Sequence, residues 1–131
     1  MIVTINPSVI SGNIHAPASK SSMQRACAAA LISNGETIIS NAGNSNDDLA
    51  ALGVIQKLGA VVTPKENNTI LVKGSDFTSS STEINCGESG LGLRMFAPVA
   101  ALSQHEIILN GSGSLLKNPL AFLINCHFHS K

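Results

Sequence analysis

The chain has 131 residues, of which 44% are hydrophobic and 12% are charged, and its formal net charge is zero. This length and composition predict one globular unit with a hydrophobic core and exclude a disordered chain. With four Phe and no Trp or Tyr, the neutral chain lacks the basic charge and the aromatic platforms of nonspecific nucleic-acid binders. Nucleic acid is therefore not an expected partner.

The cysteines indicate a reducing compartment. Cys27, Cys86 and Cys126 are odd in number and far apart, which favours free thiols over a disulfide scaffold. The opening residues read as structured sequence rather than as a signal peptide, and no apolar run reaches the length of a membrane span. We therefore expect a cytoplasmic protein with no membrane partner.

The first predicted elements are a strand and a helix. The strand covers Ile2–Ile5 and ends before Pro7. The helix runs from about Ser22 to Ser33, because an alanine-rich run follows a potential capping box, Ser21 with Gln24 three positions later.

A buried strand is predicted next, over Glu36 to Ser40 and centred on Ile38 and Ile39. A second helix follows, with Ser45 as its cap and Gly59 at its end. Beyond it, the predicted elements are a hairpin joining Val61–Thr63 to Thr69–Val72, a strand over Glu83–Cys86, a helix over about Leu91–Leu102 that Pro98 should kink or shorten, and a strand over Glu106–Leu109.

The chain repeats itself at an offset of 69 residues. Six identities without a gap link 25–45 to 94–114, and the order of the predicted elements matches as well. A chance match between two apolar segments is the alternative. We interpret the pattern as a duplicated βαβαββ-like unit, complete over about 13–73 and incomplete over about 82–131. The identical pairs are Arg25/Arg94, Ala28/Ala97, Ile38/Ile107, Ile39/Ile108, Asn41/Asn110 and Ser45/Ser114.

The start of the first helix has the residue types of an anion site. Lys20, Ser21 and Arg25 stand where a helix start leaves backbone N–H groups unpaired and carries partial positive charge. A phosphate or carboxylate binds such N–H groups together with a hydroxyl and a guanidinium, and Lys20 could also donate a proton. The alternative is an ordinary capped helix with solvated cations.

The matching place in the second repeat is the glycine-rich loop Gly87–Arg94. Gly90 and Gly92 allow the backbone to approach a ligand closely, and Arg94 is the second of the two arginines in the chain. A plain turn with Arg94 in a structural ion pair is the alternative. The spacings of nucleotide-binding loops are absent, so no nucleotide is expected here.

Two other clusters have structural explanations. Asp47 and Asp48 form a carboxylate pair, but stabilisation of a helix start accounts for them. Residues Cys126–His129 suggest a metal site, yet no second ligand cluster supports it, so we expect no metal.

Four segments together resemble a known enzyme family. Residues 16–37 are similar to its opening motif, which is Pro-Gly-Ser-Lys-Ser, then Arg, then an Ala/Leu helix ending in Gly-x-Thr. Residues 85–102 are similar to its Gly-Asn/Glu-Ser/Ala-Gly-x-x-x-Arg loop and helix, and 45–60 and 109–119 resemble the segments that follow each. The likeness covers about residues 2–123 in the right order, and the family is that of 5-enolpyruvylshikimate-3-phosphate (EPSP) synthase, or 3-phosphoshikimate 1-carboxyvinyltransferase.

The resemblance implies an α+β fold of two domains built from repeated βαβαββ units, the inverse α/β barrel of the enolpyruvyl transferases. This chain would hold one full unit and part of a second, within the N-terminal half. The implied enzyme transfers the enolpyruvyl group of phosphoenolpyruvate to the 5-hydroxyl of shikimate 3-phosphate and releases phosphate, using no cofactor. The substrates would lie in the cleft between the two domains.

Carried over by position, the resemblance also implies residue roles. Lys20, Ser21 and Arg25 would hold shikimate 3-phosphate, and Lys20 would contact phosphoenolpyruvate as a catalytic residue. Gly90 would lie against phosphoenolpyruvate, while Glu88 and Arg94 would shape that loop.

The sequence departs from the family in three respects. Family members are much longer, and the missing C-terminal domain carries the catalytic base. Asn118 stands where an arginine usually precedes Pro119, and residues 124–131 stop resembling a family helix. We therefore expect a fragment that is inactive alone and that could self-associate. The alternatives are the related transferase acting on UDP-N-acetylglucosamine and a non-catalytic αβ module.

Overall fold

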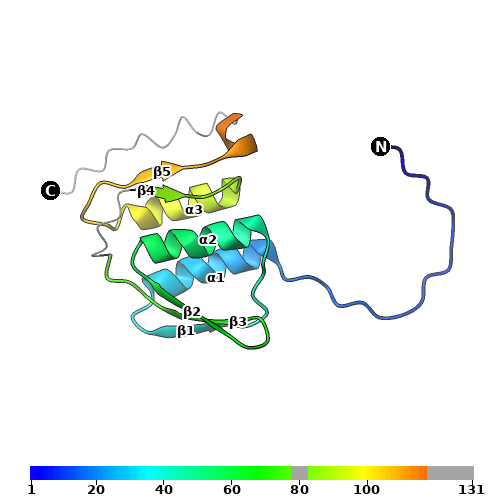
Figure 1. The fold of residues 1–131 in the computed structure, drawn as a ribbon, viewed down its shortest axis with the longest axis horizontal. Helices are drawn as coiled ribbons and strands as arrows, with labels where there is room; N and C mark the ends of the chain where they lie inside the picture. Colours follow the sequence, from blue (N-terminus) through cyan, green and yellow to red (C-terminus); the bar gives the residue numbers. More distant parts are fainter. Residues whose placement is uncertain (78–82, 118–131) are drawn as a thin grey trace.

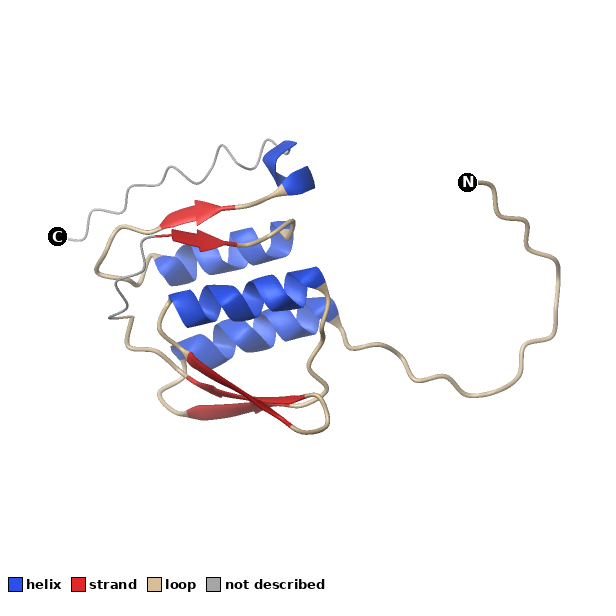
Figure 2. Cartoon of the chain, viewed as in Figure 1, coloured by secondary structure: helices blue, strands red, loops and turns tan. Residues whose placement is uncertain are grey.

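The computed structural model describes residues 1–77 and 83–117, which form three α-helices and two small sheets (Figure 1). The helices lie in one layer between the sheets (Figure 2). This mixed content confirms the predicted α+β class. The elements are α1 (Lys20–Ile32), β1 (Glu36–Ile39), α2 (Asn46–Lys57), β2 (Val61–Lys65), β3 (Thr69–Lys73), β4 (Glu83–Asn85), α3 (Gly90–Ala100), β5 (Ile108–Asn110) and the 3-10 helix η1 (Gly113–Lys117).

The cap of α1 is Ser19, so the predicted capping box of Ser21 with Gln24 is wrong. Ser19 has an extended backbone, and its hydroxyl accepts the Ser22 N–H at 3.3 Å. The helix therefore begins two residues earlier than predicted. Gln24 turns inward instead of reaching back to the cap, and it is 1% exposed.

The second helix confirms its prediction at both ends. Ser45 and Asp48 form a reciprocal capping box at its start, in which each side chain accepts the other residue's backbone N–H. At its end the chain passes through Gly59 with φ at +102°, a left-handed conformation that glycine adopts without a steric penalty.

The first sheet has the strand order β1-β3-β2 and is antiparallel throughout. The predicted hairpin is confirmed, and its turn between the paired Lys65 and Thr69 places Asn67 and Asn68 at φ +54° and +50°, a left-handed conformation that asparagine tolerates better than most residues. The prediction of a buried strand centred on Ile38 and Ile39 is confirmed for Ile39 and wrong for Ile38. Ile39 faces the helices, while Ile38 is 69% exposed, because successive side chains of a strand point to opposite faces.

The second sheet pairs β4 with β5 in parallel, and α3 is the connection between them. Glu83, Ile84 and Asn85 face Ile108, Leu109 and Asn110 in register. Pro98 lies in the last turn of α3, which ends at Ala100 rather than at the predicted Leu102. The order of a helix, a strand and a further helix thus occurs in both halves, as α1–β1–α2 and as α3–β5–η1, although η1 is only a short 3-10 helix. The unit bounds at 13–73 and 82–131 stay predictions.

Residues 1–19 form neither helix nor strand, so the predicted strand over Ile2–Ile5 is wrong. Figure 1 shows this arm extending away from the packed elements. A strand needs a neighbour that takes up its backbone hydrogen bonds, and the described residues offer none to this segment. Its apolar side chains, Ile2 and Ile14 among them, are exposed.

The hydrophobic core lies between the helices and on both sides of their layer. Phe96 on α3, Leu31 on α1 and Ile55 on α2 are all completely buried. Aliphatic residues supply most of the remaining core, as the scarcity of aromatic residues predicts. In the part of the chain that the structure describes, no helix has the length and apolar character needed to cross a membrane.

The two described cysteines, Cys27 and Cys86, are free and belong to this core. Burial raises the pKa of the Cys27 thiol to about 12, with a smaller contribution from the charge of Asp48, and burial raises that of Cys86 to about 11. Because the thiolate is the nucleophile, neither cysteine is suited to covalent chemistry.

In a Cys126→Ser variant, we expect Cys27 and Cys86 to resist iodoacetamide at pH 8 until the protein is unfolded. The folded thiols keep protons that the unfolded chain loses above pH 9.0, so their contribution to stability is complete below that pH. It declines as the pH rises through 11 to 12. Mass spectrometry of labelling with and without urea checks the first expectation, and rapid labelling of the native protein would contradict it.

Candidate functional site

All three α-helices begin at the same end of their layer (Figure 1). Ser19, Ser45 and Ser89 cap α1, α2 and α3, and each hydroxyl accepts the N–H of the residue three positions on at 2.9–3.3 Å. Each cap satisfies one N–H and leaves others of the first turn free for a ligand. The positive ends of three helix dipoles therefore meet here, which favours negative charge.

A groove of about 750 Å³ opens at this end of the helices. It lies among the first turns of α1 and α2, the loop before α3 and the segment at the start of η1. Polar groups and glycine make up its lining, which consists of Lys20, Ser45, Asn46, Asp47, Gly87, Glu88, Ser112 and Ser114.

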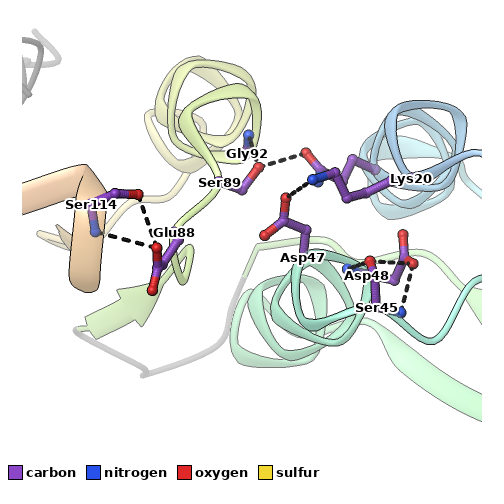
Figure 3. A network of polar contacts seen from close by, with 9 residues as sticks. Lys20, Ser45, Asp47, Asp48, Glu88, Ser89, Gly92 and Ser114 are labelled. Atoms are coloured by element: carbon purple, nitrogen blue, oxygen red, sulfur yellow. Dashed lines mark hydrogen bonds and ion pairs between the residues drawn. The ribbon is translucent and has the colours of Figure 1, made fainter. Parts of the chain in front are cut away.

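The lysine of the groove is paired across two helices. Lys20 Nζ lies 2.8 Å from Asp47 Oδ2, joining the first turn of α1 to that of α2 (Figure 3). The hydrogen bond to Asp47 and the charge of Asp47 raise the pKa of Lys20 above its ordinary value, so the side chain stays an ammonium at neutral pH.

The opposite side of the groove holds a carboxylate–serine contact. Glu88 Oε2 accepts hydrogen bonds from Ser114 Oγ at 2.9 Å and from the Ser114 N–H at 3.3 Å (Figure 3). Ser45 makes the same pair of contacts with Asp48 Oδ2, at 2.6 Å and 2.9 Å. The same pair of contacts thus occurs at Ser45 and at Ser114, which the 69-residue offset aligns. At Ser114 the acid comes from another loop, because the residue three positions after Ser114 is Lys117, whereas the residue three positions after Ser45 is Asp48.

A buried hydrogen bond fixes α3 against α1 beside the groove. Ser89 Oγ donates to Gln24 Oε1 at 3.0 Å while accepting the Gly92 N–H at 2.9 Å. Both Gln24 and Ser89 are buried, at 1% and 5% exposed. Ser89 therefore both caps α3 and hydrogen-bonds that helix to α1.

The structure brings two of the six sequence-predicted site residues into the groove lining, Lys20 and Glu88. Arg25 and Arg94 are exposed, and Arg25 Nη1 donates to the Ser21 carbonyl at 3.1 Å. The predicted site residues that do not line the groove are Ser21, Arg25, Gly90 and Arg94.

Sequence reasoning missed the groove residues that α2 and η1 contribute. A signal existed for two of them, because Ser45 and Ser114 are a matched pair of the 69-residue repeat and both line the groove. The interpretation of Asp48 as a helix-start residue is confirmed. For Asp47 it is incomplete, because that carboxylate also pairs with Lys20. Ser112 carries no signal that sequence reasoning could have used.

Among residues 1–77 and 83–117, no group of three or more His, Cys, Asp or Glu side chains is placed to hold a metal ion. The tail Cys126–His129, the departure at Asn118 and the ending 124–131 lie outside the described residues.

These observations define an α+β domain with a polar groove at the end of the layer where its helices begin, lined by one lysine, two carboxylates, serines, an asparagine and a glycine. The chain belongs to the EPSP synthase (3-phosphoshikimate 1-carboxyvinyltransferase) family, whose model matches residues 5–126. A relative from Clostridium kluyveri with the name 3-phosphoshikimate 1-carboxyvinyltransferase is 35% identical over 119 residues, which are 90% of this chain and 28% of the relative. One from Chlamydia felis with the same name is 36% identical over 123 residues, 92% and 27% of the two chains.

The fold agrees with that membership. The structure of EPSP synthase from Acinetobacter baumannii superposes with a TM-score of 0.73 at 21% sequence identity, covering 83% of this chain and 25% of that one. The chain thus spans less than a third of the length of the curated relatives it matches. None of these matches favours the alternative transferase acting on UDP-N-acetylglucosamine.

Proposed function

We propose that this chain supplies the N-terminal part of a site that transfers the enolpyruvyl group of phosphoenolpyruvate to the 5-hydroxyl of shikimate 3-phosphate. The observation that carries the proposal is the groove lined by the starts of α1 and α2 and by the loop before α3, with Lys20 in its lining, in a chain of this family. Both substrates are polyanions, and partial positive charge with free N–H donors at helix starts suits their phosphates.

Within that site we assign residues by their position in the family motifs. Lys20, Ser21 and Arg25 hold shikimate 3-phosphate, and Lys20 also contacts phosphoenolpyruvate and serves as the proton donor. Gly90 lies against phosphoenolpyruvate, with Glu88 and Arg94 shaping the loop. The contacts of Glu88 with Ser114 support a shaping role, because they hold the loop before α3 to the start of η1.

The proposal places the rest of the site outside this chain. Longer relatives would complete the βαβαββ repeats of an inverse α/β barrel and add a second domain across the groove. Two observations support an incomplete site: the chain matches about 28% of its relatives, and both arginines are exposed and do not line the groove. We therefore expect the chain alone to bind a substrate without turning it over.

Titration of the chain with shikimate 3-phosphate is expected to shift the amide NMR signals around Lys20 and Arg25. Lys20→Met removes a charge-assisted hydrogen bond, so the affinity of this variant for shikimate 3-phosphate should fall roughly 10- to 100-fold. Lys65→Met, which removes an exposed lysine from the hairpin, is the matched control and should bind as the parent does.

Two results would contradict the proposal. One is an equal loss of affinity in the Lys20 and Lys65 variants, which would mean that only net charge attracts the ligand. The other is robust phosphate release from shikimate 3-phosphate and phosphoenolpyruvate by the 131-residue chain, which would mean that the missing part is not needed.

A further inference from the structure

Asp47 stands out in the groove because it is a carboxylate at a place where the helices favour an incoming anion. It is the second residue of α2, and its partner Lys20 is the first residue of α1. Their contact at 2.8 Å joins two helices rather than two neighbours on one helix. Stabilisation of the α2 start alone does not require that contact, since Ser45 and Asp48 already cap the helix.

The two partners differ in how firmly the fold holds them. The Asp47 side chain is 16% exposed, whereas the Lys20 side chain is 56% exposed. The capping box next to Asp47 fixes the turn from which it projects. A lysine has a flexible four-carbon stem, so without a partner its ammonium samples many positions. The fixed carboxylate therefore sets the position of the mobile ammonium, and not the reverse.

We propose that Asp47 is a positioning residue that holds the Lys20 ammonium at the groove for an anionic substrate. The inference rests on the function proposed above and extends it to a residue that the family motifs of the sequence do not assign. An ammonium has three N–H donors, and Asp47 occupies one in the structure. The others remain for a phosphate or carboxylate oxygen, so the pair need not break when the ligand binds.

The carboxylate also brings a cost, because its negative charge repels the ligand. The groove is open to solvent, and salt at 0.15 M screens exposed charges over about 8 Å. The attraction between Asp47 and Lys20 acts over 2.8 Å. The repulsion between Asp47 and a bound anion acts over a longer distance, because the anion would lie on the far side of the ammonium. We therefore expect the gain from an ordered ammonium to exceed the repulsion at that salt concentration.

The first part of the test needs no ligand. Relaxation of the Lys20 ε-methylene NMR signal should report a restricted side chain in the parent and a mobile one in Asp47→Asn. Asp47→Glu should restore part of the restriction. Asp48→Asn removes the same charge from the same turn and weakens the cap, but it should leave Lys20 restricted. Equal Lys20 mobility in the parent and in Asp47→Asn would overturn the proposal.

The second part is a double-mutant cycle on the affinity for shikimate 3-phosphate in 0.15 M salt. Asp47→Asn should weaken binding about three- to tenfold in the parent but have no further effect in Lys20→Met, because Asp47 acts through Lys20. Equal effects in both backgrounds, or tighter binding by Asp47→Asn, would overturn positioning. If the parent binds no shikimate 3-phosphate, the proposed function fails, while the relaxation data still decide whether Asp47 orders Lys20.

Discussion

Phe96→Ala is expected to lower the free energy of unfolding by about 3–5 kcal/mol, which is the usual cost of removing a large aromatic side chain from a core. Phe96 is completely buried in the middle of α3 and is among the largest side chains of the core. Its removal leaves a cavity that aliphatic neighbours on rigid helices fill only in part. Urea unfolding followed by circular dichroism measures the change.

Leu102→Ala is the matched control for that substitution. Leu102 lies just beyond the same helix, is also apolar and is 60% exposed. Its replacement should change the free energy of unfolding by no more than about 0.5 kcal/mol. If both variants lost similar amounts of stability, α3 would not be packed as the structure describes.

The sequence predicted well those elements whose ends carry local chemistry. For α2, Ser45 and Asp48 specify the start and Gly59 specifies the stop, each through residues close to that end of the helix, and both ends are confirmed. The hairpin turn at Asn67 and Asn68 is similarly local. At α1 three serines within four positions, Ser19, Ser21 and Ser22, could each cap the helix, and the structure selects Ser19.

The prediction failed where the outcome depends on what packs nearby. Ile2–Ile5 has the composition of a strand, but it has no partner strand among the described residues. Gln24 fits the local pattern of a capping box, yet its long-range bond to Ser89 prevails. Motifs in the sequence identify Lys20 and Glu88 as site residues. Asp47 lines the groove because the first turns of α1 and α2 lie side by side, which no local pattern in the sequence indicates.

The hydrogen bond from Ser89 to Gln24 predicts the second large effect on stability, that of Ser89→Ala. Loss of the N-cap costs about 1 kcal/mol, and leaving the buried Gln24 Oε1 without its donor costs about 1–3 kcal/mol more, so we expect a total of about 2–4 kcal/mol. Thermal unfolding monitored by circular dichroism or calorimetry provides the measurement.

Ser19→Ala is the control that measures the loss of an N-cap without the loss of a bond to another helix. Ser19 caps α1 by the same geometry but is exposed and accepts one N–H, so its loss should cost about 1 kcal/mol or less. Replacing Gln24 with Met should reduce the further cost of Ser89→Ala to that of a cap alone, because no buried acceptor is then left unpaired. Equal costs for the two serine substitutions would mean that the bond to Gln24 contributes nothing. The start of α3, and with it the loop that carries Glu88 into the groove, would then be fixed by apolar packing rather than by Ser89.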